Sequence, residues 1–270
     1  MTTHGAFADH GDDRYFSRAG YRAILTRARA LAYAVVPFRD FAGPGADAGP
    51  VLLLRHDLDH DLDSALVLAE IEAADGIAAT YFVQVACDFY NLLAPAGRAA
   101  IRALAGMGHE IGLHYVAARY AGVDADANLA ADIRLLEDLS GTAVVSAAQH
   151  IPIDGGVVDL SARIRNEAYD PRFSSGAMTY ISDSLMAWRQ ETPHDLLDAG
   201  RSFQLLTHPE CWTARHRRMT DVFAALEAAE TESVRGRFAA TLEHYATLMR
   251  ERAERDRRFR EARRGPPPPR

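Results

Sequence analysis

The chain has 270 residues, of which 48% are hydrophobic and 25% charged, as is typical of a globular protein that can bury a full core. Its net charge of −7 disfavours general nucleic-acid binding. All 30 basic residues are arginine, which excludes a lysine Schiff base and a Walker-type phosphate lysine. The two cysteines, Cys87 and Cys211, are too few for a disulfide framework or a cysteine-based zinc site.

The ends of the chain differ in composition from the middle. Residues 1–14 are polar and acidic without the apolar core of a signal peptide, and we expect a flexible leader there. The terminal GPPPPR, residues 265–270, predicts a disordered tail. Residues 15–264 show no repeat or linker and are predicted to form a single domain. No window approaches the roughly 18 apolar residues that are needed to span a bilayer, so we expect a soluble cytoplasmic protein without membrane partners. We also expect no nucleic-acid partner. The sequence does not predict the oligomeric state.

The first half of the chain alternates between helical and strand patterns. Ser17 is placed to cap a helix over residues 18–33. The run VLLLRHDLDH, residues 51–60, predicts a buried strand that ends in charge. A helix over 63–75, with Asp61 or Asp63 as its cap, and a strand over 78–85 follow.

The alternation continues and then becomes less regular. Further helices are predicted over residues 97–107 and 128–139, and strands over 109–116, 143–148 and 202–207. Between residues 155 and 200 only short strand candidates occur, at 172–173 and 178–181. A long helical pattern runs from residue 219 to about residue 264. Repeated strand–helix units of this kind predict an α/β fold built on a parallel sheet or barrel.

Polar side chains follow several of the predicted strands. Asp57 and Asp59 end the first strand, and His114, His150 and His208 end three later ones. The carboxyl ends of parallel strands meet at one rim, so these groups are expected to converge. One such histidine alone is more often a hydrogen-bonded loop residue, but carboxylates and imidazoles together suit a divalent metal or an acid–base site.

These residues also carry a family resemblance. Residues 108–114, GHEIGLH, look like the G-H-E-I-G-x-H segment of the polysaccharide deacetylases (NodB homology, carbohydrate esterase family four), and residues 56–59, HDLD, resemble a divergent H-D-x-D branch. Leu206-Thr207-His208 is similar to the late L-x-H motif. The resemblance covers about Val51 to Trp212. It implies an irregular (β/α)7-type barrel, here with an N-terminal helix and a long C-terminal helix.

The resemblance implies metal-dependent hydrolysis of an N-acetyl, less often O-acetyl, group. Asp57 would be the catalytic base and His208 the general acid, with Asp59 and His114 as metal ligands. Two positions depart from the family pattern. The place of the second metal histidine is taken by Ala118, and the R-x-P motif, whose arginine orients the base, corresponds to His150-Ile151-Pro152.

A third metal ligand is therefore expected from elsewhere in the chain. His150 is the first choice, because its strand should neighbour that of His114. His60 is its substitute, and His208 is a third possibility that would remove it from the acid role. The expected metal is Zn²⁺, with Co²⁺, Ni²⁺, Mn²⁺ or Fe²⁺ as alternatives.

The expected substrate is a small intracellular acetylated molecule, such as an amino sugar or a glycan or natural-product precursor. Its binding residues are predicted to be Tyr81, Tyr180, Asp183 and Trp188. Two other functions stay open. One is a metal-dependent amidohydrolase that acts on a non-sugar cyclic amide. The other, favoured by Ala118, is a non-catalytic binding protein on a degenerate deacetylase barrel.

Overall fold

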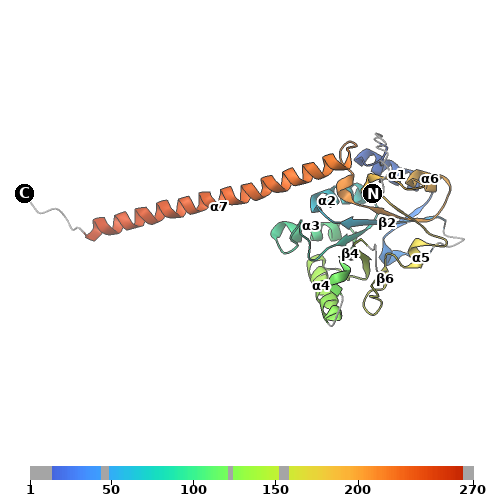
Figure 1. Ribbon diagram of the computed structural model, residues 1–270, viewed down its shortest axis with the longest axis horizontal. Helices are drawn as coiled ribbons and strands as arrows, with labels where there is room; N and C mark the ends of the chain where they lie inside the picture. Colours follow the sequence, from blue (N-terminus) through green and yellow to red (C-terminus); the bar gives the residue numbers. More distant parts are fainter. Residues whose placement is uncertain (1–13, 44–48, 121–123, 152–157, 264–270) are drawn as a thin grey trace, which may run out of the picture. The chain divides into compact units, whose positions relative to one another are not determined.

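The computed structural model describes residues 14–43, 49–120, 124–151 and 158–263 (Figure 1). The predicted tail and, apart from Arg14, the predicted leader lie outside these ranges. The strands are β1 Ala34–Val36, β2 Val51–Leu58, β3 Thr80–Val83, β4 Glu110–Tyr115, β5 Ser146–Gln149, β6 Asn166–Glu167, β7 Thr179–Ser182 and β8 Phe203–Thr207. The helices are α1 Arg18–Ala30, α2 Leu62–Ala74, α3 Pro95–Gly106, α4 Ala125–Ser140, α5 Pro171–Ser174, α6 Pro193–Asp198 and α7 Met219–Arg263. Short 3-10 turns are η1 Phe38–Asp40, η2 Ala117–Tyr120, η3 Ser184–Met186 and η4 Pro209–Cys211.

The strands form one parallel sheet, which confirms the predicted α/β class and its barrel type. The sheet order is β6-β5-β4-β3-β2-β8-β7, and β1 pairs with the first residues of β2. Helices α6, α1, α2, α3 and α4 pack one against the next around the outside of this sheet. Since all the strands run the same way, the carboxyl ends of β2, β4, β5 and β8 lie along a single rim.

Side chains fill the space between the two end strands, β6 and β7. The Gln204 side chain on β8 donates hydrogen bonds to the carbonyls of Ala168 and Phe173 at 3.0 Å. The rings of Tyr169, after β6, and Tyr180, on β7, lie 5.9 Å apart. Among the described strands, β6 and β7 are joined by side chains and not by backbone hydrogen bonds, and this makes the barrel irregular.

Capping groups fix where the helices begin and end. The Ser17 hydroxyl accepts a hydrogen bond from the Gly20 amide, which confirms its predicted role at the start of α1. Asp61 caps α2, because its carboxylate accepts from the amides of Asp63 and Ser64. Gly141 ends α4 with φ of +73°, a conformation that glycine adopts without a steric penalty.

The predicted strand at residues 172–173 is wrong. These residues lie in helix α5, which begins with Pro171 after an Asp170 side chain that accepts from the Arg172 amide. Proline at the first helical position and an aspartate cap both favour a helix, and they outweigh the local strand propensity. The short elements β1, β6 and α6 were not predicted, because two to six residues carry too little periodicity.

Helix α7 confirms the long predicted C-terminal helix and extends over 45 residues. The chain divides after Met219 into two compact units, and the second contains α7 from Thr220 onward. The single domain predicted for residues 15–264 stays a prediction. Within the described residues no helix combines the length and apolar character needed to cross a membrane.

Candidate metal centre

Strand β2 places three charged side chains on the inner face of the barrel. Alternate residues of a strand share a face, so Arg55 and Asp57 point inward together, and Asp59 follows where the strand ends. The Arg55 guanidinium donates to Asp57 Oδ2 at 2.8 Å and to the Tyr169 hydroxyl at 3.0 Å. Burial alone would lower the pKa of Arg55, but the adjacent Asp57 raises it above its ordinary value, so the pair stays charged. Asp57 Oδ1 is buried and has no hydrogen-bond partner in the described part of the chain.

Asp59, His114 and His150 converge beside this pair. His114 Nε2 and His150 Nδ1 each lie 3.1 Å from Asp59 Oδ1, and the two nitrogens lie 3.1 Å from each other. A tetrahedral zinc ion with bonds of about 2.0–2.1 Å spaces its ligand atoms by about 3.4 Å. The three donor atoms therefore form one face of a tetrahedron of suitable size, and this trio is a possible metal site.

Neighbouring groups orient these ligands. His114 Nδ1 lies 2.8 Å from the Ala148 carbonyl, which can only accept, so the proton is on Nδ1 and the Nε2 lone pair faces the trio. The Gln84 amide donates to Asp59 Oδ1 at 3.0 Å. Burial would raise the pKa of Asp59, but the adjacent imidazoles of His114 and His150 bring it well below its usual range. Asp59 is therefore a carboxylate at neutral pH, as a metal ligand requires.

His208, directly after β8, also approaches the trio. Its Nδ1 donates to Asp183 at 2.6 Å, and its Nε2 lies 3.6 Å from Asp59 Oδ2. Asp183 also accepts from the Trp212 indole at 2.8 Å, so its position is fixed. Burial alone would lower the pKa of His208, but Asp183 outweighs this and raises it to about 10. A protonated imidazole that faces the site is suited to donate a proton.

His60 and Ala118 complete the rim. His60 Nδ1 lies 2.7 Å from Glu210, and its ring lies 4.7 Å from that of Phe89. The hydrogen bond to Glu210 raises the pKa of His60 above its ordinary value. Among the described residues, the trio with converging ligand atoms contains His150 and not His60. Ala118 lies on η2, in the wall of a recess of about 780 Å³ that also includes His114.

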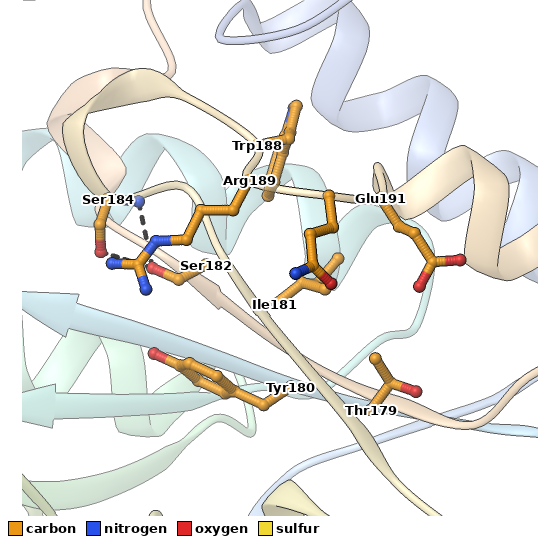
Figure 2. Close-up of a pocket in the computed structure, with 9 residues that line it drawn as sticks. Thr179, Tyr180, Ile181, Ser182, Ser184, Trp188, Arg189 and Glu191 are labelled. Atoms are coloured by element: carbon orange, nitrogen blue, oxygen red, sulfur yellow. Dashed lines mark hydrogen bonds between the residues drawn. The ribbon is translucent and has the colours of Figure 1, made fainter. Parts of the chain in front are cut away.

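A second recess, of about 230 Å³, lies along β7 (Figure 2). Tyr180 and Trp188, two of the predicted substrate residues, line it together with Ser182, Ser184 and Arg189. Figure 2 shows the Arg189 guanidinium beside the two serines, whose hydroxyls lie 2.5 Å apart. The Trp188 indole nitrogen is buried without a hydrogen-bond partner among the described residues. Asp183 follows Ser182 directly, which links this recess to His208.

Tyr81 lies elsewhere, in a buried polar network behind β2. His56, on the outward face of the strand, is 2.7 Å from the Glu72 carboxylate of α2 through its Nε2. The hydroxyls of Tyr81, at 2.9 Å, and of Tyr21 also donate to Glu72. These side chains are fully buried. The network joins α1, α2 and β3 to the strand that carries the two site aspartates.

We expect Glu72→Gln to destabilise the fold by about 3 kcal/mol, because it removes the charged acceptor of a buried hydrogen-bonded group. Burial would raise the pKa of Glu72, but His56 lowers it below its ordinary value. The contribution of ionised Glu72 to the free energy of unfolding is therefore fully present above the pKa of an unfolded glutamate. It is lost as the pH falls through the lower pKa that Glu72 has in the folded protein. Urea unfolding at pH 7 and at pH 3.5 measures this, with the exposed Glu70→Gln as control. A loss that is the same at both pH values would contradict it.

Some residues of this site were not identified from the sequence. The Arg55–Asp57 pair was missed, although strand alternation places residues 55 and 57 on one face. Glu210, the partner of His60, and Glu72 were missed because their contacts depend on how η4 and α2 pack on the barrel. Periodicity carries no signal for such long-range pairs.

Comparison with known proteins gives structural neighbours only. No family model matches the chain, and no curated protein matches it. The solved structures to which it is similar include the chitin deacetylase of Colletotrichum lindemuthianum, with a TM-score of 0.43, 16% identity, and coverage of 72% of this chain and 86% of that one. A family 4 carbohydrate esterase from Bacillus anthracis has a TM-score of 0.41 and 13% identity, covering 86% and 93%.

A third neighbour is a pseudoenzyme of the same family from Bacillus anthracis, with a TM-score of 0.40, 13% identity, and coverage of 72% and 66%. These solved structures come from carbohydrate esterase family four or are polysaccharide deacetylases, the family that the sequence motifs resemble. The TM-scores lie below 0.5, so the function of this chain is inferred from its own site.

Proposed function

We propose that this protein is a metal-dependent deacetylase that hydrolyses the acetamide of a small amino compound. The observation that carries the proposal is the trio Asp59, His114 and His150, whose donor atoms are mutually 3.1 Å apart. Asp57, which has a carboxylate oxygen without a hydrogen-bond partner among the described residues, lies 3.8 Å from His114, and the protonated His208 lies 3.6 Å from Asp59. One carboxylate and two imidazoles form a ligand set that suits Zn²⁺ and leaves a position open.

When bound, the metal supplies Lewis-acid chemistry, which polarises a carbonyl group and makes water more acidic. The residues of the chain supply the proton transfers. Asp57 Oδ1 accepts a proton from the attacking water, and Arg55 on Oδ2 holds the carboxylate in place. His208, held by Asp183, donates its Nε2 proton to the departing amine nitrogen. Water adds to the acetyl carbon, the C–N bond breaks, and acetate and the amine are released.

The recess along β7 supports an amino sugar, or a precursor with hydroxyl groups, as the substrate. Ser182, Ser184 and Arg189 offer hydroxyl and guanidinium groups, and Tyr180 and Trp188 offer aromatic surfaces. Sugars bind through such a combination of hydrogen bonds and flat apolar contact. The position of Ser182 beside Asp183 puts this recess next to the proposed acid, where the part of the substrate beyond the acetyl group would lie.

Acetate release from a substrate panel tests the proposal. The zinc-loaded protein is assayed with N-acetylated amino sugars, with O-acetylated sugars and with cyclic amides. We expect release from the N-acetyl compounds, abolished by a chelator and restored by Zn²⁺. Turnover of the cyclic amides alone would favour the amidohydrolase instead. Metal binding without any turnover would contradict the proposed catalysis.

A further inference from the structure

Helix α7 carries an apolar stripe that the deacetylase site does not use. Phe238, Leu242, Tyr245 and Met249 follow one another at intervals of four, three and four residues. Their side chains are 69%, 67%, 57% and 72% exposed. This spacing places them along one side of a helix, as in the seam of a coiled coil. We call these four residues the α7 stripe.

The α7 stripe has well-defined limits. Ala239 and Ala246 lie beside it, and small residues at such positions let another helix approach closely. The next seam position at either end is an arginine, Arg235 before the stripe and Arg252 after it. The stripe is therefore a short apolar segment with its centre between residues 243 and 244.

A helix with this pattern needs a partner. Val222 is the one residue of α7 that is buried. Most helical stability in proteins comes from the packing of an apolar face, and a contiguous exposed apolar patch marks an interaction site. Among the described residues of the second compact unit, which begins at Thr220, α7 is the one helix or strand.

Charge on the two sides of the stripe identifies the partner. Residues 219–243 hold five carboxylates and two arginines, a net charge of −3. Residues 250–263 hold seven arginines and four carboxylates, a net charge of +3. The helix is thus acidic before its apolar centre and basic after it. A second copy in the opposite direction complements both halves, whereas a parallel copy would place like charges together.

We propose that α7 pairs with α7 of a second copy of this chain as an antiparallel two-helix coiled coil, stripe against stripe. The twofold axis passes near residues 243 and 244, so that Phe238 faces the partner's Met249 and Leu242 faces the partner's Tyr245. Each contact occurs twice, as in a closed isologous dimer. The antiparallel arrangement also aligns the helix dipoles favourably. The proposal does not depend on the proposed deacetylase activity.

Sedimentation equilibrium of the full chain over about 1–50 μM tests the pairing, a range in which specific homodimers assemble. We expect a dimer for the natural sequence and a monomer for Leu242→Glu/Met249→Glu, which places charge in the stripe. The matched control Ala240→Glu/Thr247→Glu adds the same charge on the opposite side of the helix and stays dimeric. A monomeric natural chain, or equal dimerisation of both double variants, would overturn the proposal.

Cross-linking tests whether the two α7 helices run antiparallel. This test stays valid even if the charged variants lose helix content. Phe238→Cys and Met249→Cys are made separately in a Cys87→Ser background and treated with a short bis-maleimide. The antiparallel model expects cross-linked dimers when the two variants are mixed and few when either is alone. Efficient cross-linking of each variant with itself would indicate a parallel pair and overturn the model.

Discussion

Zinc affinity is expected to fall by more than about 100-fold in His150→Ala, because two remaining ligands cannot hold the ion in a tetrahedral site. His150 Nδ1 lies 3.1 Å from both Asp59 Oδ1 and His114 Nε2, so its removal opens one corner of the trio. Competition with a chromophoric chelator measures the change. His60→Ala is the control, since His60 contacts Glu210 instead.

The control also distinguishes the possible third ligands. Retained affinity in His150→Ala with lost affinity in His60→Ala would make His60 the ligand and would require the segment after β2 to rearrange. Circular dichroism of both variants shows that the fold is intact. His150 is only partly buried, at 25% side-chain exposure, so its truncation is not expected to unfold the barrel.

Turnover is expected to fall about 10³-fold in Asp57→Asn, within the usual range for loss of a general base, while zinc stays bound. An amide keeps the shape of the carboxylate but cannot accept the proton of the attacking water. Asp57 Oδ2 lies 3.8 Å from His114 Nε2, whereas Asp59 Oδ1 lies at 3.1 Å, so Asp57 is assigned to the reaction and Asp59 to the metal.

Steady-state kinetics and zinc content of Asp57→Asn are measured together. Asp63→Asn, an exposed change in α2, is the matched control and is expected to retain both properties. Loss of zinc from Asp57→Asn would mean that the two aspartates have exchanged roles. Full turnover with zinc bound would exclude Asp57 as the base.

Much of the fold could be predicted from local patterns in the sequence. The run 51–60 predicted a buried strand because it opens with four aliphatic residues, and strand β2 occupies Val51–Leu58 of it. Ser17 marked the start of a helix through its capping side chain, which is a local property. The segment from 155 to 200 was less predictable, since its elements are short and depend on packing against the rest of the barrel.

The site was predictable where its residues end neighbouring strands. His114 lies near the end of β4 and His150 follows β5, and the direct pairing of these two strands brings the rings together. Asp183 was expected to contact substrate, which stays a prediction, and its observed role of holding His208 and Trp212 was not foreseen. Its role depends on β7 lying beside β8, a pairing of strands that the sequence pattern did not define.

Because Arg55 orients Asp57 from within the same strand, the orientation of Asp57 and the affinity of the trio for a metal depend on different segments of the chain. Both residues belong to β2, so the geometry of the proposed base, Asp57, is set by the pleat of one strand in the barrel interior. His150, directly after β5, therefore does not have to orient Asp57, and it contributes its imidazole to the trio. Substitutions after β5 should therefore tune metal affinity and leave the base intact. Substitutions around Arg55 should impair the base and leave the metal ligands in place.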